Sequence, residues 1–342
     1  MGRIKGALIS ANKKPVRVKS MALAVFYALA LALALILIFH NNPLEDPHTA
    51  MLKKVCGCVL IAVGGILFYA WYDKLTVLPV ELWNSRKLIK RLAVNDFKKR
   101  YAGSYMGIVW ALAQPVVTVC MYYIVFDVVF TAKAQAVSGG VEVPYVLFLT
   151  AGLVPWFYFS EALINGTTSL LEYNYLVKKV LFKISILPII KIIAAMFIHI
   201  FFIGVMMIIA CIYGYYPNIY WLQLIYYIGC EFILVLSISY ATCAIVVFFR
   251  DLLQIISIGL QLFQWATPIL WNIEIVPDKY KWLVKLNPMT YIVEGFRNSI
   301  YGDTWFFEHF YSSTYFWLFV VASFCLGALI FKRSKTHFAD VL

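Results

Sequence analysis

The sequence predicts an all-α integral membrane protein with about eight membrane-spanning helices. Three observations lead to this fold class. Hydrophobic residues make up 63% of the chain and charged residues only 13%, whereas ordinary soluble domains carry roughly 25% charged residues. Apolar runs of about 20 residues, the length needed to cross a bilayer, recur along the chain. Lysine and arginine cluster in alternate connections between these runs, which is the pattern of cytoplasmic flanks.

Eight apolar runs are candidates for spanning helices. They cover residues 21–39, 55–75, 105–130, 145–165, 186–213, 220–248, 252–271 and 313–331. Basic residues are concentrated in segments 1–20, 74–104, 166–185 and 332–342. An even number of spans with both termini in the cytoplasm places all these basic segments on one side. The net charge of +12 is therefore attributed to membrane topology, and no nucleic-acid partner is expected.

The first two runs are expected to form an added hairpin. The run 21–39 is longer than the apolar core of a secretory signal and no clear cleavage site follows it, so a retained anchor helix is expected. The polar linker 74–104 separates the hairpin from the six remaining runs. Three regions follow: an N-terminal segment 1–80, an amphipathic helix within 81–104 and a six-helix body 105–342. A single bundle of all eight helices is the alternative.

A basic amphipathic stretch, ELWNSRKLIKRLAVNDFKKR, extends from Glu81 to Arg100. On a helix its apolar side chains share one broad arc, and Lys87, Arg91 and Lys98 lie roughly opposite. Such a helix is expected to lie on the cytoplasmic membrane surface, with the apolar arc in lipid and the cations towards anionic headgroups. The apolar arc consists of Trp83, Ile89, Leu92, Ala93 and Phe97.

Two of the runs carry polar and aromatic residues at helical spacing, so that each set falls on one face. Polar side chains within a membrane are costly unless they face protein or water. We therefore expect them to line a conduit, with hydrogen bonding between helices as the alternative. Rings stack on pyranose faces and amides pair with hydroxyls, so the combination suits sugars. The candidate lining residues are Trp110, Gln114, Thr118 and Tyr122 in run 105–130, and Gln254, Ser257, Gln261 and Trp265 in run 252–271.

No catalytic constellation or metal site is evident in the sequence. The seven cysteines lie in or beside apolar runs and are expected to be small apolar filler. No Walker-type phosphate loop occurs, so ATP and its Mg²⁺ would have to be bound by a separate chain. Inside the spans, His199 is expected to be packed and hydrogen-bonded, and Glu161 and Glu231 to form structural pairs. Lys191 is close enough to a helix end to extend towards the membrane surface.

Two connections are expected to contain short helices. LEYNYLVKKVLFKISILP, at 171–188, has an apolar edge and a lysine-rich edge, so its helix could sit in a partner's groove or contact lipid alone. Segment 272–312 is too long for a turn and includes NPMTYIVEGFRNSIYG. We expect it to form two short helices that dip partly into the outer leaflet, shielded by protein.

Five ordered motifs carry a resemblance to a known family. They are DFKKRYAGSYMGIVWALAQP, PYVLFLTAGLVPWFYFSEAL, LVKKVLFKISILP, FFRDLLQI and LNPMTYIVEGFRNSIYG. Together they show that residues from about 82 to 342 resemble the membrane subunit of ABC-type polysaccharide exporters. These permeases move O-antigen, capsule or teichoic acid chains across the bacterial cytoplasmic membrane.

The resemblance implies a homodimer with two ATP-binding cassette subunits. Helix 82–100 would be the gate helix near the lipid entry, segment 171–188 the coupling helix on the ATPase, and segment 272–312 the outer re-entrant helices. The coupling residues would be Glu172, Tyr175, Leu176, Lys178 and Lys179. With this resemblance we expect an undecaprenyl-diphosphate-linked polysaccharide as the substrate, and cations would bind its diphosphate. Its headgroup would be captured near Arg91, Lys98, Lys99 and Arg100.

Three other functions are alternatives to polysaccharide export. A drug or small-lipid efflux permease of related architecture would have a narrower and more apolar pathway. A membrane-embedded glycosyltransferase or acyltransferase would need an acid or histidine pair near a membrane face. A passive scaffold would leave the two polar stripes without a purpose.

Overall fold

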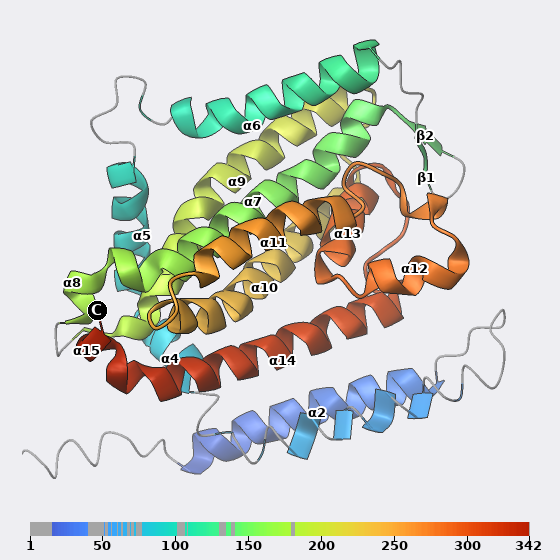
Figure 1. Cartoon of the computed structure of the whole chain (residues 1–342). Helices are drawn as coiled ribbons and strands as arrows, with labels where there is room; N and C mark the ends of the chain where they lie inside the picture. The colour runs from blue at the N-terminus through green and yellow to red at the C-terminus, as the bar shows by residue number, and fades with distance from the viewer. Residues whose placement is uncertain are drawn as a thin grey trace, which may run out of the picture. The chain divides into compact units, whose positions relative to one another are not determined.

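The computed structural model of the chain is shown in Figure 1. It describes residues 16–39, 51, 54–55, 57–59, 61–62, 64–66, 69, 72, 77–100, 107, 109–129, 135–137, 141–178 and 182–341. The chain divides into two compact units, Met1–Val77 and Leu78–Leu342.

The first unit contains helix α2 (Val16–Phe39), which covers the first predicted run. Two contacts join α2 to the second run and to Lys54, the residue just before it. The Tyr27 hydroxyl donates to the Gly65 carbonyl at 3.0 Å, and Lys54 Nζ donates to the Ile38 carbonyl at 2.9 Å. A Cβ on Gly65 would lie 3.2 Å from the Tyr27 ring, so glycine permits this close approach. The contacts agree with a hairpin. The basic residues 1–15 and parts of 55–75 lie outside the described residues.

The second unit is almost entirely helical. Its elements are α4 (Val77–Asn84), which begins at the unit boundary, α5 (Arg86–Arg100), α6 (Val109–Tyr122), the π-helix η1 (Tyr123–Val129), β1 (Gln135–Val137), β2 (Val141–Val143), α7 (Tyr145–Glu172), α8 (Asn174–Val177), η2 (Ile184–Ile186), α9 (Leu187–Ile212), η3 (Ile219–Leu222), α10 (Gln223–Val246), α11 (Leu252–Ala266), η4 (Ile273–Ile275), α12 (Asp278–Lys285), α13 (Pro288–Tyr301), α14 (Phe310–Ser334), η5 (Lys335–His337) and α15 (Phe338–Val341). The antiparallel pair β1–β2, with Ala136 opposite Glu142, was not predicted. Ser-Gly-Gly lies between the two strands in the sequence, and Gly-Gly is a hairpin signal.

Four helices of the described residues are long and apolar enough to cross a membrane. They are Tyr145–Glu172, Ile184–Ile212, Ile219–Val246 and Phe310–His337. These correspond to the fourth, fifth, sixth and eighth predicted runs. Shorter apolar helices at Val116–Phe126 and Leu252–Ala266 fall in the third and seventh runs. The structure thus has the helices of a membrane protein, and the count of eight spans stays a prediction.

Helix α7 is the centre of the second unit. Within their most apolar stretches, 78% of α7 is buried inside the protein, against 28% of α14, which lies at the periphery. Helix α7 packs on α9 and α10, and α10 packs on α14 (Figure 1). Small residues allow the close α7–α10 contact: a Cβ on Gly166 would lie 2.5 Å from Ser239 Oγ. The hydroxyls of Thr167 and Thr242 meet at 2.7 Å in the same contact, as is common between membrane helices.

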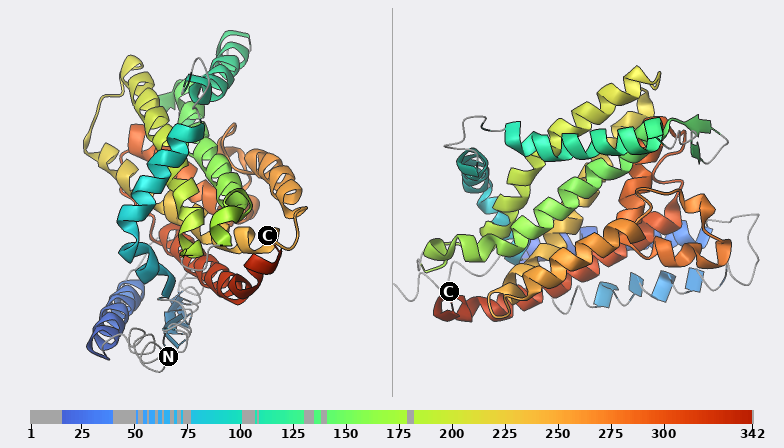
Figure 2. Two further views of the ribbon diagram at one scale, coloured as in Figure 1. Left: turned by 90° about the vertical axis from the view of Figure 1, so that its left-hand side faces the viewer. Right: turned by 45° about the horizontal axis from the view of Figure 1, so that its top comes forward.

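The basic segments of the second unit meet at one end, which we call the basic end. Helices α5, α8 and α15 and the turn between α10 and α11 lie at this end, whereas β1–β2, α12 and α13 lie at the opposite end (Figure 1). The left view in Figure 2, taken from the basic end, shows the α4–α5 segment across the bundle. The predicted alternation of basic and neutral connections agrees with this arrangement.

The opposite end is held together by Arg297 of α13, one of the largest fully buried side chains among the described residues. Its guanidinium donates to the carbonyls of Pro268, Ile269 and Phe148 at 2.5, 2.8 and 3.4 Å, and to Glu294 Oε1 at 2.8 Å. It also lies 3.5 Å from the centre of the Phe148 ring. Pro268 and Ile269 follow the end of α11, so their carbonyls have no helical partner. Arg297 donates to both of them and to Phe148, and so joins α13, the segment after α11 and the start of α7.

Candidate functional site

Helix α5 packs on protein through its apolar arc, so the prediction that this arc faces lipid is wrong. Ile89 and Ala93 are buried, and the Phe97 ring lies 5.2 Å from the Phe197 ring of α9. An amphipathic pattern shows that one face is apolar, but it does not tell whether lipid or protein covers that face. Trp83 does not belong to this arc, since it is 70% exposed and lies in α4, before the turn at Ser85.

Two acids attach this basic segment to the body of the protein. Ser185 Oγ donates to Glu81 Oε2 at 2.7 Å, and Lys191 Nζ donates to Asp96 Oδ1 at 2.9 Å. Sequence reasoning missed both contacts. The sequence did contain an indication of these contacts, because Glu81 and Asp96 are the only acids in a stretch with seven lysines and arginines.

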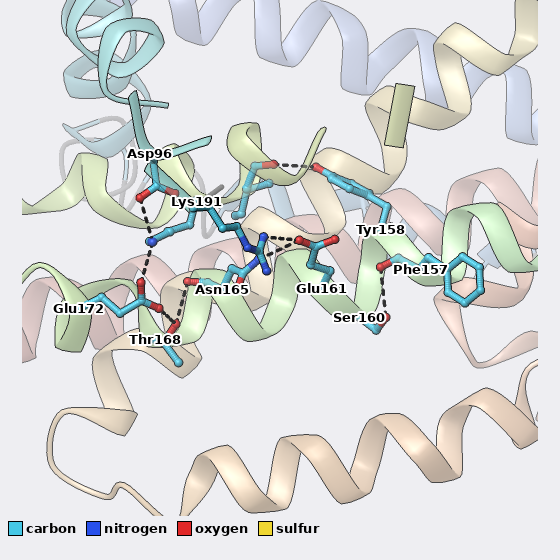
Figure 3. Close-up of polar contacts among 11 residues, drawn as sticks. Asp96, Phe157, Tyr158, Ser160, Glu161, Asn165, Thr168, Glu172 and Lys191 are labelled. Atoms are coloured by element: carbon cyan, nitrogen blue, oxygen red, sulfur yellow. Dashed lines mark hydrogen bonds and ion pairs between the residues drawn. The ribbon is translucent and has the colours of Figure 1, made fainter. Parts of the chain in front are cut away.

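Lys191 lies at the centre of an ion-pair cluster at the basic end, shown in Figure 3. We define this cluster as Asp96, Arg100, Glu161, Glu172 and Lys191. Besides Asp96, Lys191 Nζ binds Glu172 Oε2 at 2.6 Å, at the last residue of α7. The expectation that Lys191 extends to the membrane surface is therefore wrong. Two carboxylates within reach hold its ammonium inside the protein, where opposite charges interact more strongly than in water.

Tyr173 completes the attachment of α5. Its hydroxyl donates to Asp96 Oδ1, and its ring lies 5.0 Å from Lys191 Nζ. Burial, followed by the hydrogen bond to Asp96, raises the pKa of the Tyr173 phenol well above its ordinary value. The phenol is thus a neutral donor to the carboxylate throughout the physiological pH range.

The second half of the cluster is the ion pair between Arg100 and Glu161. Glu161 Oε1 also lies 3.5 Å from the side-chain nitrogen of Asn165. A cavity of about 360 Å³ opens beside these groups. It is lined by Asp96, Lys99, Arg100, Asn165, Glu172, Lys191 and Ala194. Acids and bases are mixed around it, so its walls do not form a simple anion trap.

The four cations expected at the lipid entry differ in their surroundings. Arg91, Lys98 and Lys99 are exposed at the surface of α5. Arg100 is also exposed, but its charge is shared with Glu161. Exposed cations without an ion pair can bind an incoming anion directly, so Arg91, Lys98 and Lys99 are better placed than Arg100 to bind a lipid headgroup.

Four of the five predicted coupling residues lie at the end of α7, in α8 or directly after it. Glu172 is paired with Lys191, and Thr168 Oγ1 donates to its other oxygen at 2.6 Å. Leu176 is half-buried against the core, whereas Tyr175 and Lys178 are exposed. Lys179 lies outside the described residues. A partner at this end would therefore meet Tyr175 and Lys178 directly, and Glu172 through its ion pair.

The predicted stripe on α6 is only partly exposed. Trp110 is 60% exposed, whereas Thr118 is half-buried and Tyr122 is half-buried with its ring 6.0 Å from that of Phe126. The side chain of Gln114 lies outside the described residues. The stripe therefore turns from the surface at Trp110 towards the core at Tyr122.

The predicted stripe on α11 lies on the outside of the chain. Gln254 and Gln261 are exposed, Trp265 is 66% exposed, and Ser257 is half-buried with its hydroxyl bonded to its own helix at Leu253. Within the described residues, neither of these two glutamine amides hydrogen-bonds to another helix of the chain. The alternative of hydrogen bonding between helices of one chain is thus not supported for them.

Glu161 forms an ion pair, as predicted, and His199 is packed, as predicted, but neither His199 nor Glu231 makes a hydrogen bond within the described residues, so the prediction of a hydrogen-bonded His199 is wrong. His199 Nε2 lies 3.5 Å from Glu231 Oε2, both side chains are buried, and the Tyr158 ring stacks on the imidazole at 4.6 Å. Glu161 pairs with Arg100. Among the described residues, no group of three or more histidines, cysteines or acids could hold a metal ion.

Comparison with known proteins shows where the chain belongs. The sequence pattern of the ABC-2 type transporters matches residues 87–301, well over half of the chain. The chain belongs to the ABC-2 type transporter family. It is therefore the membrane component of a transporter rather than an enzyme, and ATP is the ligand of a separate ATP-binding subunit.

Three relatives of this ABC-2 permease share its sequence over most of their length. Two proteins of Klebsiella pneumoniae named O-antigen export system permease protein RfbA are 28% and 29% identical to it over 249 residues, which is 72% of this chain and 92% of each relative. A protein of the same name from Myxococcus xanthus is 26% identical over 223 residues, which is 65% of this chain and 83% of that one.

Proposed function

We propose that this ABC-2 permease is the membrane subunit of an ATP-driven exporter of a lipid-linked polysaccharide, of the O-antigen, capsule or teichoic acid type. The names of the relatives support this substrate class, since the alignment covers nine-tenths of the Klebsiella proteins. The observation that carries the proposal is the exposed face of α11, where Gln254, Gln261 and Trp265 point away from their own chain.

Amides on the outside of a membrane helix need a partner, because an unpaired polar group in hydrocarbon is costly. A second copy of the chain would supply one if the two α11 faces enclose a water-filled path. Trp110, Gln114 and Tyr122 would extend that path from α6. Rings and amides along it suit a glycan, as the sequence predicts, and a homodimer is the smallest assembly that closes it.

The basic end would face the cytoplasm of a bacterial cell, with both termini on that side of the inner membrane. The body would contribute six spans and the N-terminal segment 1–80 an added hairpin, giving eight. The outer helices α12 and α13 would dip into the outer leaflet. Two ATP-binding subunits would dock below Tyr175 and Lys178, where the structure exposes side chains at the tip of the α7–α8 turn.

The diphosphate of an undecaprenyl carrier would be captured at α5. Arg91, Lys98, Lys99 and Arg100 place four cations near the membrane surface on this helix. Three of them are exposed without an ion pair between described residues, and cations of this kind bind phosphate oxygens through charge-assisted hydrogen bonds.

The function is tested by reconstituting the permease with its ATP-binding subunit in proteoliposomes. An undecaprenyl-diphosphate-linked glycan is supplied outside, and its ATP-dependent uptake into inside-out vesicles is measured. The double variant Gln254→Leu, Gln261→Leu should lose most of this transport while the folded complex is retained. Leu262→Gln, on the same exposed helix, is the matched control and should keep it.

The lipid-entry role has its own test in the same vesicles. Lys99→Ala with Arg100→Ala should reduce the stimulation of ATP hydrolysis by the lipid-linked glycan. Lys332→Ala with Arg333→Ala, a pair of exposed cations at the end of α14, should leave it unchanged. Uptake of a small lipid or drug but not of the glycan would favour the efflux alternative and overturn the proposal.

A further inference from the structure

We propose that Lys191 is a positioning residue that couples the ATPase-facing turn of this permease to helix α5. This inference rests on the proposed function, because it assumes that an ATP-binding subunit docks at the α7–α8 turn. It adds a specific connection between that turn and the lipid-entry helix.

Lys191 is attached to three elements at once. It belongs to the second turn of α9, and its ammonium binds Asp96 of α5 at 2.9 Å and Glu172 at the end of α7 at 2.6 Å. Tyr173, next to Glu172, donates to the same Asp96 oxygen and places its ring beside the ammonium. The turn is thus joined to α5 by the Lys191 side chain, which Figure 3 shows between Asp96 and Glu172, and by the Tyr173 hydroxyl.

Lys191 forms two ion pairs, an arm to Asp96 of α5 and an arm to Glu172 at the turn, and these two arms differ in strength. Lys191 and Asp96 are only 12% and 14% exposed, so the arm to α5 is shielded from water and salt. Glu172 is 48% exposed, and exposed ion pairs contribute little. A docked subunit that moves or re-pairs Glu172 breaks the weak arm first. Lys191 then remains with Asp96, and the Tyr173 hydroxyl is left as the tie between α5 and the turn.

The surroundings give α5 room to respond. The cavity of about 360 Å³ lies directly beside Asp96, Glu172 and Lys191, so the C-terminal end of α5 is not close-packed there. Nearer the start of the helix, Ile89 and Ala93 fix the same face of α5 to α9. A helix that is packed firmly at its start and borders a cavity at its end can shift at that end when a polar tie changes.

Arg100 and Glu161 form a neighbouring pair that provides the control. This pair also joins α5 to α7, and its side chains are 43% and 28% exposed. Glu161 lies three turns before the end of α7, however, and it does not touch the turn itself. A static attachment of α5 would use both pairs alike, whereas coupling to the turn would use only Lys191 and Glu172.

The test follows the position of α5 in the reconstituted complex with its ATP-binding subunit. Asn95→Cys, exposed on α5, is labelled with a charged maleimide in the apo state and after trapping with ATP and vanadate; the chain without this cysteine gives the background. We expect the labelling rate to differ between the two states. Lys191→Met should reduce that difference by about fivefold or more. Glu161→Gln should retain it.

Glu172→Gln keeps the test decisive if Lys191→Met does not assemble. This change leaves Lys191 paired with Asp96 and removes only the charge of the weak arm, so it should also reduce the labelling difference. A difference that survives in both Lys191→Met and Glu172→Gln would overturn the coupling role and leave a simple structural tie. If the unsubstituted complex shows no difference between states, the proposed docking of the ATPase at this turn fails instead.

Discussion

Replacing Arg297 should destabilise the permease more than almost any other single change at the end opposite the basic one. In Arg297→Met the new side chain has a similar length and fills most of the same volume, but it has no donors. The carbonyls of Phe148, Pro268 and Ile269 would lose their guanidinium partner, and Glu294 would lose its counter-charge.

The magnitude follows from these contacts. The carbonyls of Pro268 and Ile269 lie outside the helices, and an unsatisfied buried acceptor costs about 1–3 kcal/mol, so the two together give about 2–6 kcal/mol. Phe148 lies inside α7 and keeps its helical hydrogen bond, and Glu294 is 37% exposed, so these two groups add little. A loss of roughly 2–6 kcal/mol corresponds to a fall of the melting temperature on the order of 10 °C. Arg297→Lys keeps the charge without the planar fork, so its loss should be intermediate.

The assay is the thermal unfolding of the purified protein in detergent, followed by tryptophan fluorescence. Arg333→Met, an exposed arginine at the end of α14, is the control and should melt within about 1 °C of the unsubstituted protein. Glu294 is 37% exposed, so Glu294→Gln should cost less than Arg297→Met. If Arg297→Met melts together with the Arg333 control, the guanidinium does not hold this end together and the reasoning is refuted.

Two further predictions concern packing in the same unit. Gly295→Ala should destabilise the protein by about 1–3 kcal/mol, because the new Cβ would lie 2.1 Å from a tyrosine ring of α10. Gly204→Ala is the control, because Gly204 has open space around it and the change should not destabilise the protein. Equal melting temperatures for the two variants would contradict the close packing at Gly295. Ile89→Ala should cost about 2–5 kcal/mol if α5 packs on protein. Trp83→Ala, at an exposed position of α4, should cost under 1 kcal/mol in the same melting assay, and the reverse order would mean that the apolar arc of α5 faces lipid.

The long apolar helices were predictable from the sequence because their cause is local. A run such as 186–213 must form a helix in a membrane, since only intrahelical hydrogen bonds satisfy its backbone there. The two short helices expected in segment 272–312 are also present, as α12 and α13. The polar stripe on α11 was predicted from spacing alone, because residues on one helical face repeat at fixed intervals whatever surrounds them; its role as a conduit lining stays a prediction.

The ion-pair cluster could not be predicted in the same way. Asp96 and Lys191 are 95 residues apart, and the lysine near a helix end gave equal reason to expect extension towards the membrane surface. Arg297 was likewise read only as part of a motif, because the carbonyls that it binds belong to α7 and to the segment after α11. Pairing between distant residues depends on how helices pack, which no local pattern encodes.

The basic amphipathic stretch shows what the sequence determines and what only the tertiary structure determines. The sequence by itself determined that residues 86–100 form a helix with one apolar and one cationic face, because helical periodicity is a property of neighbouring residues. Only the tertiary structure decided that α9 covers the apolar face and that Asp96 binds Lys191. Burial of Ile89 and Ala93 requires a complementary surface, and that surface exists only once α7 and α9 have packed together.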